Sequence, residues 1–209
     1  MTRQYWKNDV EHVFEGAVTF GGAVSGLQRS NLVQESETEI VLEPEGWKVH
    51  DAPANNLPAT SATDDLAILG GTYGTDGIYV GTGDVKTLSV TRYARRSVRI
   101  PPEYVASQTI KLRVRCGMLT TIADGSCTID VECRKKDGNT AVGSELQAGA
   151  AQSMNSTAFA DFDFTITSTA LAPGDELDIR IAIACVDTAT GTAVDPAIGK
   201  TSLLVDTKG

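Results

Sequence analysis

Histidines and carboxylates are the residues of this sequence that could do acid–base or metal chemistry, and their spacing selects no site. Its two histidines, His12 and His50, do not stand in a metal-ligand spacing such as HxH or HExxH. Carboxylates are plentiful, but at alternate strand positions they usually form a solvated outer face. The acidic groups that could be proposed as acid–base pairs or calcium ligands are Asp64-Asp65, Asp161 with Asp163, and Asp175-Glu176 with Asp178.

Motifs for covalent or nucleotide chemistry are also missing from the sequence. It contains no GxSxG, and Gly81-Thr82-Gly83 lacks both the third glycine and the following helix of a dinucleotide loop. A histidine-based triad would have to join the N-terminal part of the chain to its C-terminal part, and no feature indicates that. We therefore predict a protein that is not an enzyme, with no catalytic residues, no metal and no cofactor.

The four cysteines occupy apolar positions inside strand-like runs, and no CxxC spacing occurs. Such thiols behave as small buried hydrophobic groups, and a chain of this size does not need disulfides for stability. We therefore expect four free thiols: Cys116, Cys127, Cys133 and Cys185.

Charge limits the partners that the chain can have. The net charge is -9, which argues against nucleic-acid binding because such proteins carry a basic field. The one basic cluster, formed by four arginines within residues 92–99, could be an anion or partner site, although we prefer cross-strand pairing with the many acids. No apolar run approaches the about 20 residues of a membrane span, and the N-terminus lacks the apolar region of a signal peptide, so we expect synthesis in a cytoplasm. The cluster consists of Arg92, Arg95, Arg96 and Arg99.

Period-two alternation of apolar and polar residues predicts the elements that must position these side chains. The rows run through 110–116, 127–134, 159–167 and 177–185, with no helical pattern between them. We expect an all-β fold over residues 64–209: an antiparallel β-sandwich of the jelly-roll type with about eight strands.

One hairpin register satisfies both faces of the first two rows. It places Leu112 opposite Val131 and Cys116 opposite Cys127 on the apolar face. On the polar face it pairs Lys111 with Glu132 and Arg113 with Asp130. We therefore predict that 110–116 and 127–134 are neighbouring strands, without a disulfide between their cysteines.

The stretch Phe14 to Gly26 repeats the hexads FEGAVT and FGGAVS in phase. Its apolar row has no local partner, which favours pairing with another copy of the chain. We predict an N-terminal arm with short strands over residues 1–50. A linker follows over residues 51–63, a segment that is rich in Ala, Pro, Asn and Thr. The expected docking and oligomerisation residues are Tyr5, Trp6, Phe14, Gly16, Val18, Phe20, Gly22 and Val24.

About two-thirds of the chain resembles a group of bacteriophage virion structural proteins encoded near capsid and tail genes. The strings that carry the resemblance include GGTYGTDG, TRYARRSVRIPPEYVASQTIKLRVRCGM, DGSCTIDVECRKKDG, LAPGDELDIRIAIACVDTATGTAV and SLLVDTKG. The hexads resemble the short repeats that begin phage head fibres and tail fibres. The resemblance implies a jelly-roll virion protein, in the manner of a head decoration or head-fibre protein, and it brings no catalytic residues.

Two functions follow from the resemblance. In the first, a homotrimer docks on the major capsid protein through residues 1–50, and the sandwich decorates and stabilises the outer capsid surface. In the second, a tail-fibre or receptor-binding module recognises host surface glycans through the sandwich loops, which would require an exposed aromatic patch. The loop aromatics available for that are Tyr73, Tyr79 and Tyr104. A carbohydrate-active enzyme domain ranks third, because no residues are selected for it.

Overall fold

The computed structural model describes residues 35–71, 73–120, 125–138, 141–147, 149–188 and 191–208. They form eleven strands and one short 3-10 helix, η2, at Pro44–Gly46. The strands are β1 Glu35–Val41, β2 Ala67–Leu69, β3 Tyr79–Gly81, β4 Ser89–Arg99, β5 Ile110–Met118, β6 Gly125–Lys136, β7 Val142–Glu145, β8 Gln152–Ser153, β9 Ala160–Ile166, β10 Glu176–Asp187 and β11 Pro196–Lys208.

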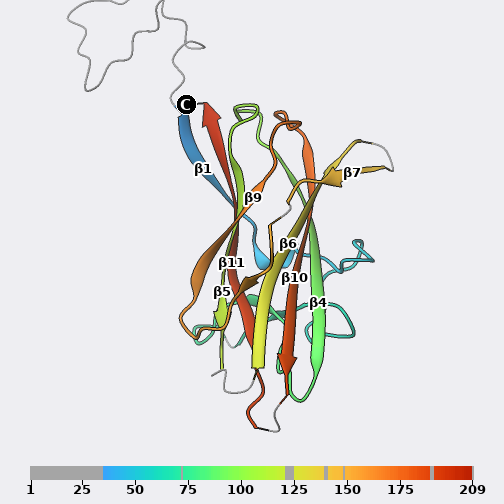
Figure 1. The fold of residues 1–209 in the computed structure, drawn as a ribbon, viewed down its shortest axis with the longest axis vertical. Coiled ribbons are helices and arrows are strands. Elements are labelled where there is room, and N and C mark those ends of the chain that lie inside the picture. The colour runs from blue at the N-terminus through green and yellow to red at the C-terminus, as the bar shows by residue number, and fades with distance from the viewer. Residues whose placement is uncertain are drawn as a thin grey trace, which may run out of the picture. The chain divides into compact units, whose positions relative to one another are not determined.

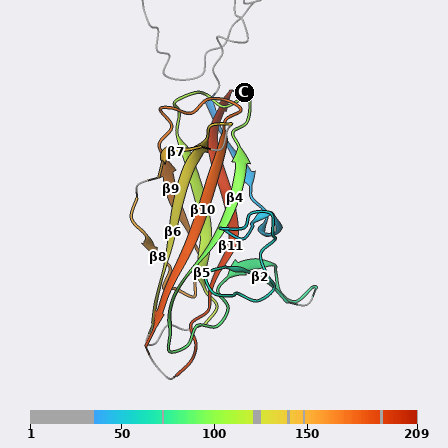
Figure 2. The ribbon, with the colours of Figure 1, turned by 90° about the vertical axis from the view of Figure 1, so that its right-hand side faces the viewer.

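Two antiparallel sheets pack face to face (Figures 1 and 2). The first has the order β1-β11-β5-β9, and the hairpin β2–β3 pairs with the beginning of β11. The second has the order β4-β10-β6-β7, and β8 also pairs with β6. The eight main strands are divided equally between the sheets, and successive strands change sheet except at the hairpin of β6 and β7. This arrangement is that of a jelly roll and confirms the predicted fold class.

The apolar rows that alternation predicted line the inner faces of both sheets. Ile110, Leu112 and Val114 on β5 are fully buried, as are the apolar residues of β6. The longest predicted row has no exposure at all. It consists of Leu177, Ile179, Ile181, Ile183 and Cys185 on β10, the strand between β4 and β6.

The predicted hairpin between β5 and β6 is wrong. β5 lies between β11 and β9 in one sheet, and β6 lies between β10 and β7 in the other. Leu112 is therefore opposite Leu203 and Phe164, whereas Val131 is opposite Ile181. The predicted register satisfied both faces because any two regularly alternating strands with opposite charges on their polar faces do so. The two strands are not neighbours because most consecutive strands of a jelly roll lie in different sheets.

Residues 35–63 belong to the sandwich, although we expected an arm and a linker there. β1 pairs with β11 along its whole length, from Glu35 opposite Lys208 to Val41 opposite Ser202. Trp47 is completely buried and Leu57 is 6% exposed, both in the main core. The described chain thus lies in one compact unit, and neither residue 50 nor residue 63 marks a boundary within it.

The sandwich has two distinct ends along its strands. At the proximal end, which we define by Glu35 and Lys208, β1 begins and β11 finishes. At the distal end, defined by Met118, Gly125 and Asp187, β5 finishes, β6 begins and β10 finishes (Figure 1). The N-terminal residues therefore join the sandwich at the end where the C-terminus also lies.

Candidate functional site: a histidine–aspartate cluster and the hollow beside it

Two segments that run along the edge strand β4 bring His50, Asp64 and Asp65 together. The Lys48 amide donates to the Arg95 carbonyl at 2.9 Å, which fixes the segment that leads into His50. The Tyr93 amide donates to the Asp64 carbonyl at 2.7 Å, which fixes the other segment. The loop over residues 51–63 closes between the two, so its ends meet beside β4.

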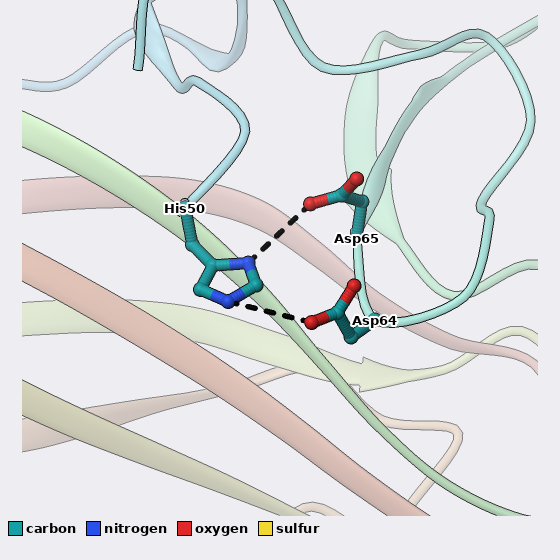
Figure 3. Close-up of side chains that lie close together, drawn as sticks. All are labelled: His50, Asp64 and Asp65. Atoms are coloured by element: carbon teal, nitrogen blue, oxygen red, sulfur yellow. Dashed lines mark hydrogen bonds and ion pairs between the residues drawn. The ribbon is translucent and has the colours of Figure 1, made fainter. Parts of the chain in front are cut away.

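Both carboxylates face the nitrogen-bearing edge of the imidazole (Figure 3). His50 Nε2 lies 3.5 Å from Asp64 Oδ2, and His50 Nδ1 lies 3.4 Å from Asp65 Oδ1. One ligand atom from each residue can be chosen so that all three lie within 4.8 Å of one another. The side chains of His50 and Asp65 are 13% and 20% exposed, whereas that of Asp64 is 46% exposed, so the cluster opens to water on the Asp64 side.

The imidazole connects the cluster to the outer face of the second sheet. Its ring lies 4.8 Å from the Tyr93 ring, and the Arg180 guanidinium lies over Tyr93 at 4.7 Å from the ring centroid. Arg95 Nε donates to Asp178 Oδ1 at 2.7 Å, and Arg180 pairs with Glu132. A hollow of about 310 Å³ lies among these groups, lined by His50, Arg95, Glu132, Arg134, Val142, Asp178 and Arg180.

The hollow therefore offers guanidinium donors next to carboxylate acceptors, each already paired. Such a surface suits a neutral ligand with several hydroxyl groups, because the ligand can bridge donors and acceptors without leaving a charge unpaired. It contains no serine, cysteine or threonine nucleophile beside the histidine among its lining residues.

A second hollow, of about 650 Å³, lies on the β2–β3 side of the distal end. Its lining combines Tyr79 and Leu119 with Thr75 and Asp76. Tyr73, in the turn between β2 and β3, is fully exposed. Other large apolar side chains exposed at this end are Leu88, Leu119 and Val186, at 50%, 47% and 42%.

One acid near the distal end is held in an unusual environment. Burial, and then the nearby charge of Asp84, raise the pKa of Asp195 to about 6. Its Oδ1 is buried without a hydrogen-bond partner among the described residues. Its backbone is fixed, because Leu119 donates to the Asp195 carbonyl and Asp195 donates to Thr120 Oγ1.

The structure pairs most of the acids that the sequence offered as candidates. Asp161 and Asp163 contact Arg115 and Arg113 at 3.1 and 2.7 Å on the outer face of the first sheet. Asp175 and Glu176 contact Lys135 and Lys136, as expected for a charged outer face. Asp178 differs, since it is 8% exposed.

The arginines of β4 make mixed contacts. The preferred interpretation, pairing with acids across strands, holds for Arg95 and Asp178. Arg92, Arg96 and Arg99 donate instead to the backbone carbonyls of Thr82, Glu43 and Gly174. The cluster therefore ties loops to the edge strand.

The expectation of four free thiols is wrong for two of them. Cys127 and Cys185 lie directly opposite each other on β6 and β10, with Cα atoms 4.2 Å apart, and form a disulfide. Cys116 and Cys133 are free and buried, as predicted. Burial raises the pKa of each thiol to about 12.

The predicted docking residues and His12 lie outside the described residues, so their roles stay predictions. They are Tyr5, Trp6, Phe14, Gly16, Val18, Phe20, Gly22 and Val24. Among the loop aromatics, Tyr73 is exposed, Tyr79 is half-buried, and Tyr104 is buried with its hydroxyl donating to the Gln108 carbonyl.

The histidine–aspartate cluster was missed because the two aspartates stand 14 and 15 residues after His50 and share no motif with it. The available signal was that His50 and the pair Asp64-Asp65 bracket a proline-containing segment. A loop that returns to its own start brings such residues together, but sequence alone does not show that it returns.

Comparisons with known proteins find likeness of fold only. No family model and no curated protein sequence matches the chain. The CBM22-1 and GH10 modules of Clostridium thermocellum xylanase Xyn10B, solved with xylohexaose, match at 16% identity and TM-score 0.40 over 85% of this chain, which spans 28% of that structure.

Two further structures resemble the chain. An apo cyclase from Fischerella sp. matches at 14% identity and TM-score 0.39, covering 85% of this chain and 91% of its own. A structure of infectious bursal disease virus, Gt strain, matches at 11% identity and TM-score 0.31, covering 72% and 42%. At these values the likeness says nothing about ligand, partner or activity. Among the described residues, no helix is long and apolar enough to cross a bilayer.

Proposed function

We propose that this chain is a non-enzymatic structural protein of a phage virion that decorates and stabilises the capsid as a homotrimer. The observation that carries the proposal is the position of the proximal end. Residues 1–34, with the two hexads, precede β1 and join the sandwich where Glu35 pairs with Lys208. An anchor at that end leaves the distal end free to face outward.

The fold and the charge support the same function. Jelly rolls serve as viral capsid domains as well as lectin domains. A net charge of -9 favours solubility at the high local concentration of a particle surface. A protein that binds only the assembled shell adds its binding free energy to the stability of the shell, and three linked sites on a trimer strengthen weak docking.

The test is binding to purified particles of the virus that encodes the chain. Deleting residues 1–26 should abolish co-sedimentation with particles and weaken the trimer, while the sandwich keeps its unfolding temperature. As a finer variant, Val18→Asp with Val24→Asp should have the same effect, because a charge cannot enter an apolar strand contact. The matched control is Leu88→Asp, which places the same charge at the exposed distal end.

Persistent trimers and normal particle binding after the deletion would overturn the role of the hexads. The number of copies of the chain per particle distinguishes a head decoration protein from a tail fibre. A decoration protein should be present in many copies that match the shell lattice, whereas a tail fibre should be present in a few.

Recognition of host glycans is the second candidate function, and the distal hollow favours it. Tyr79 beside Asp76 and Thr75 gives the hollow an aromatic surface next to polar groups, as a sugar ring requires, and the exposed Tyr73 lies in the same connection between β2 and β3. A glycan array probed with the full chain tests this. Binding should be lost in Tyr73→Ala and kept in Leu88→Ser, and no binding to any glycan would remove this candidate.

A further inference from the structure

We propose that His50, Asp64 and Asp65 form a binding site for a divalent first-row transition-metal ion, of which Zn²⁺ is the representative. The proposal goes beyond the virion function and does not depend on it. Its basis is the cluster of Figure 3, in which two carboxylates approach the two nitrogens of one imidazole.

The distance between His50 Nε2 and Asp64 Oδ2 fits a shared ion better than a direct hydrogen bond. Imidazolium–carboxylate hydrogen bonds are about 2.7–2.9 Å long, whereas these two atoms are 3.5 Å apart. The other contact, between Nδ1 and Asp65 Oδ1 at 3.4 Å, is a long hydrogen bond. Two ligands of a tetrahedral zinc with bonds of about 2.0–2.1 Å stand about 3.3–3.4 Å apart. The cluster thus has the spacing that two ligands of one ion would have.

The geometry assigns different roles to the two carboxylates. One ion cannot occupy both nitrogens of a ring, so it binds Nε2 together with Asp64 Oδ2, on the side that is open to water. Asp65 then accepts a hydrogen bond from Nδ1–H. A carboxylate behind a ligating histidine fixes its tautomer and orientation, which typically strengthens metal binding 10- to 100-fold.

The donor set selects the class of metal. Ca²⁺ and Mg²⁺ prefer all-oxygen sites, whereas an imidazole nitrogen combined with carboxylates suits zinc and its neighbours. Within the described part of the chain, Asp64 and Asp65 form ion pairs with His50 only. No lysine or arginine of these ion pairs therefore competes with a metal ion for the two carboxylates. The nearby Arg95 is directed to Asp178.

A bound ion would connect the two ends of the loop over residues 51–63. His50 precedes this loop and Asp64 follows it, and both segments are hydrogen-bonded to β4. Because the ion holds the two ends together only in the folded state, it stabilises the sandwich by mass action.

The experiment uses the full chain stripped with EDTA and then titrated with Zn²⁺, with Ca²⁺ and Mg²⁺ as separate probes. We expect one Zn²⁺ per chain by calorimetry and a rise of several degrees in the unfolding temperature, with little response to Ca²⁺ or Mg²⁺. His50→Gln and Asp64→Asn should abolish the response. Asp65→Asn should keep it but weaken affinity about 10- to 100-fold.

Two matched controls localise the site. Asp51→Asn removes the same charge from the exposed residue next to His50, and His12→Gln removes the other histidine of the chain. Both should bind Zn²⁺ as the natural chain does. Binding that survives His50→Gln, disappears in His12→Gln, or is equalled by Ca²⁺ would overturn the proposal. If His50→Gln lowers the unfolding temperature without metal, Asp64→Asn and Asp65→Asn provide the test.

Discussion

At the scale of single residues, burial decides what the four cysteines can do. Cys127 and Cys185 face each other across one strand pair and are joined, whereas Cys116 and Cys133 have no such partner and stay thiols. A thiol must ionise to react, and the pKa of about 12 that burial gives both free cysteines suppresses the thiolate at neutral pH.

We predict three levels of thiol reactivity for protein purified without reductant. Iodoacetamide at pH 8 should label none of the cysteines in the folded protein. It should label two, Cys116 and Cys133, after denaturation, and all four after denaturation with reductant. Mass spectrometry of the labelled peptides measures this, and four labels without reductant would contradict the disulfide.

Asp195 should make stability depend on pH in an unusual direction. Its pKa in the folded protein, about 6, lies above the ordinary aspartate value of 3.8, so the folded state binds the proton more tightly than the unfolded state does. The contribution of Asp195 to the free energy of unfolding is therefore fully present below about pH 4 and is lost as the pH rises to about 6.

The substitution Asp195→Asn should remove this loss of stability with rising pH. Relative to the natural chain, the variant should gain stability between pH 4 and pH 6 and keep a constant gain above pH 6. We expect about 1 kcal/mol or less, because a half-buried group is partly screened by water. Urea unfolding at pH 4, 5, 6 and 7 measures the difference, and Asp84→Asn should reproduce a smaller part of it. A difference that does not change with pH would contradict the assigned burial of this acid.

At the scale of elements, the segment between β1 and β2 is held by a few anchors. Leu42, Trp47 and Leu57 are buried among polar residues without a period. An irregular segment held by separate anchors has neither the period of two nor the period of 3.6 by which sequence patterns are recognised. That is why we expected an arm and a linker there.

Trp47→Ala should destabilise the whole sandwich. Truncating a fully buried tryptophan costs about 3–5 kcal/mol, because the removed side chain leaves a cavity in the core. Chemical denaturation monitored by circular dichroism measures the loss. The control is Trp6→Ala in the N-terminal residues, which should leave the unfolding free energy unchanged. A change below about 1 kcal/mol for Trp47→Ala would mean that residues 42–57 are an appendage.

The sequence pattern predicted the strands and their buried faces well, but it predicted poorly which strands lie side by side in a sheet. Alternation identifies β5, β6, β9 and β10 because each strand must bury one side, and this depends only on local spacing. Which strand lies beside which depends on crossovers between sheets, and β5 and β6 satisfied a false register. Because the false register placed Cys127 opposite Cys116, it did not predict that Cys127 lies opposite Cys185 and forms a disulfide with it.

The candidate site was less predictable than the fold. His50, Asp64 and Asp65 meet only because both segments pair with β4 and the loop between them closes. The lining of the hollow next to them comes from β4, β6, β7 and β10 as well, so it required the sheet order. The buried surroundings of Asp195 likewise depend on packing between distant parts of the chain.

At the scale of the whole molecule, the two ends of the sandwich should tolerate change differently. Gly191, in the loop between β10 and β11, is exposed and has open space around it. We predict that a short polar peptide inserted after Gly191 leaves the unfolding temperature and particle binding nearly unchanged. The same peptide added after Gly209 should reduce particle binding, because it crowds the proximal end. Co-sedimentation with particles measures both, and the reverse order would mean that the distal end docks.

The pairing of β1 with β11 sets the order in which the protein can be completed during synthesis. The hydroxyls of Thr38 and Thr207 lie 2.7 Å apart although 169 residues separate them. At about 5–20 residues per second, the ribosome releases the partner of β1 roughly 10–30 s after β1 itself. Through that interval the first strand has an open edge, and the first sheet closes only when β11 has emerged. The sandwich therefore cannot finish folding until β11 has left the ribosome.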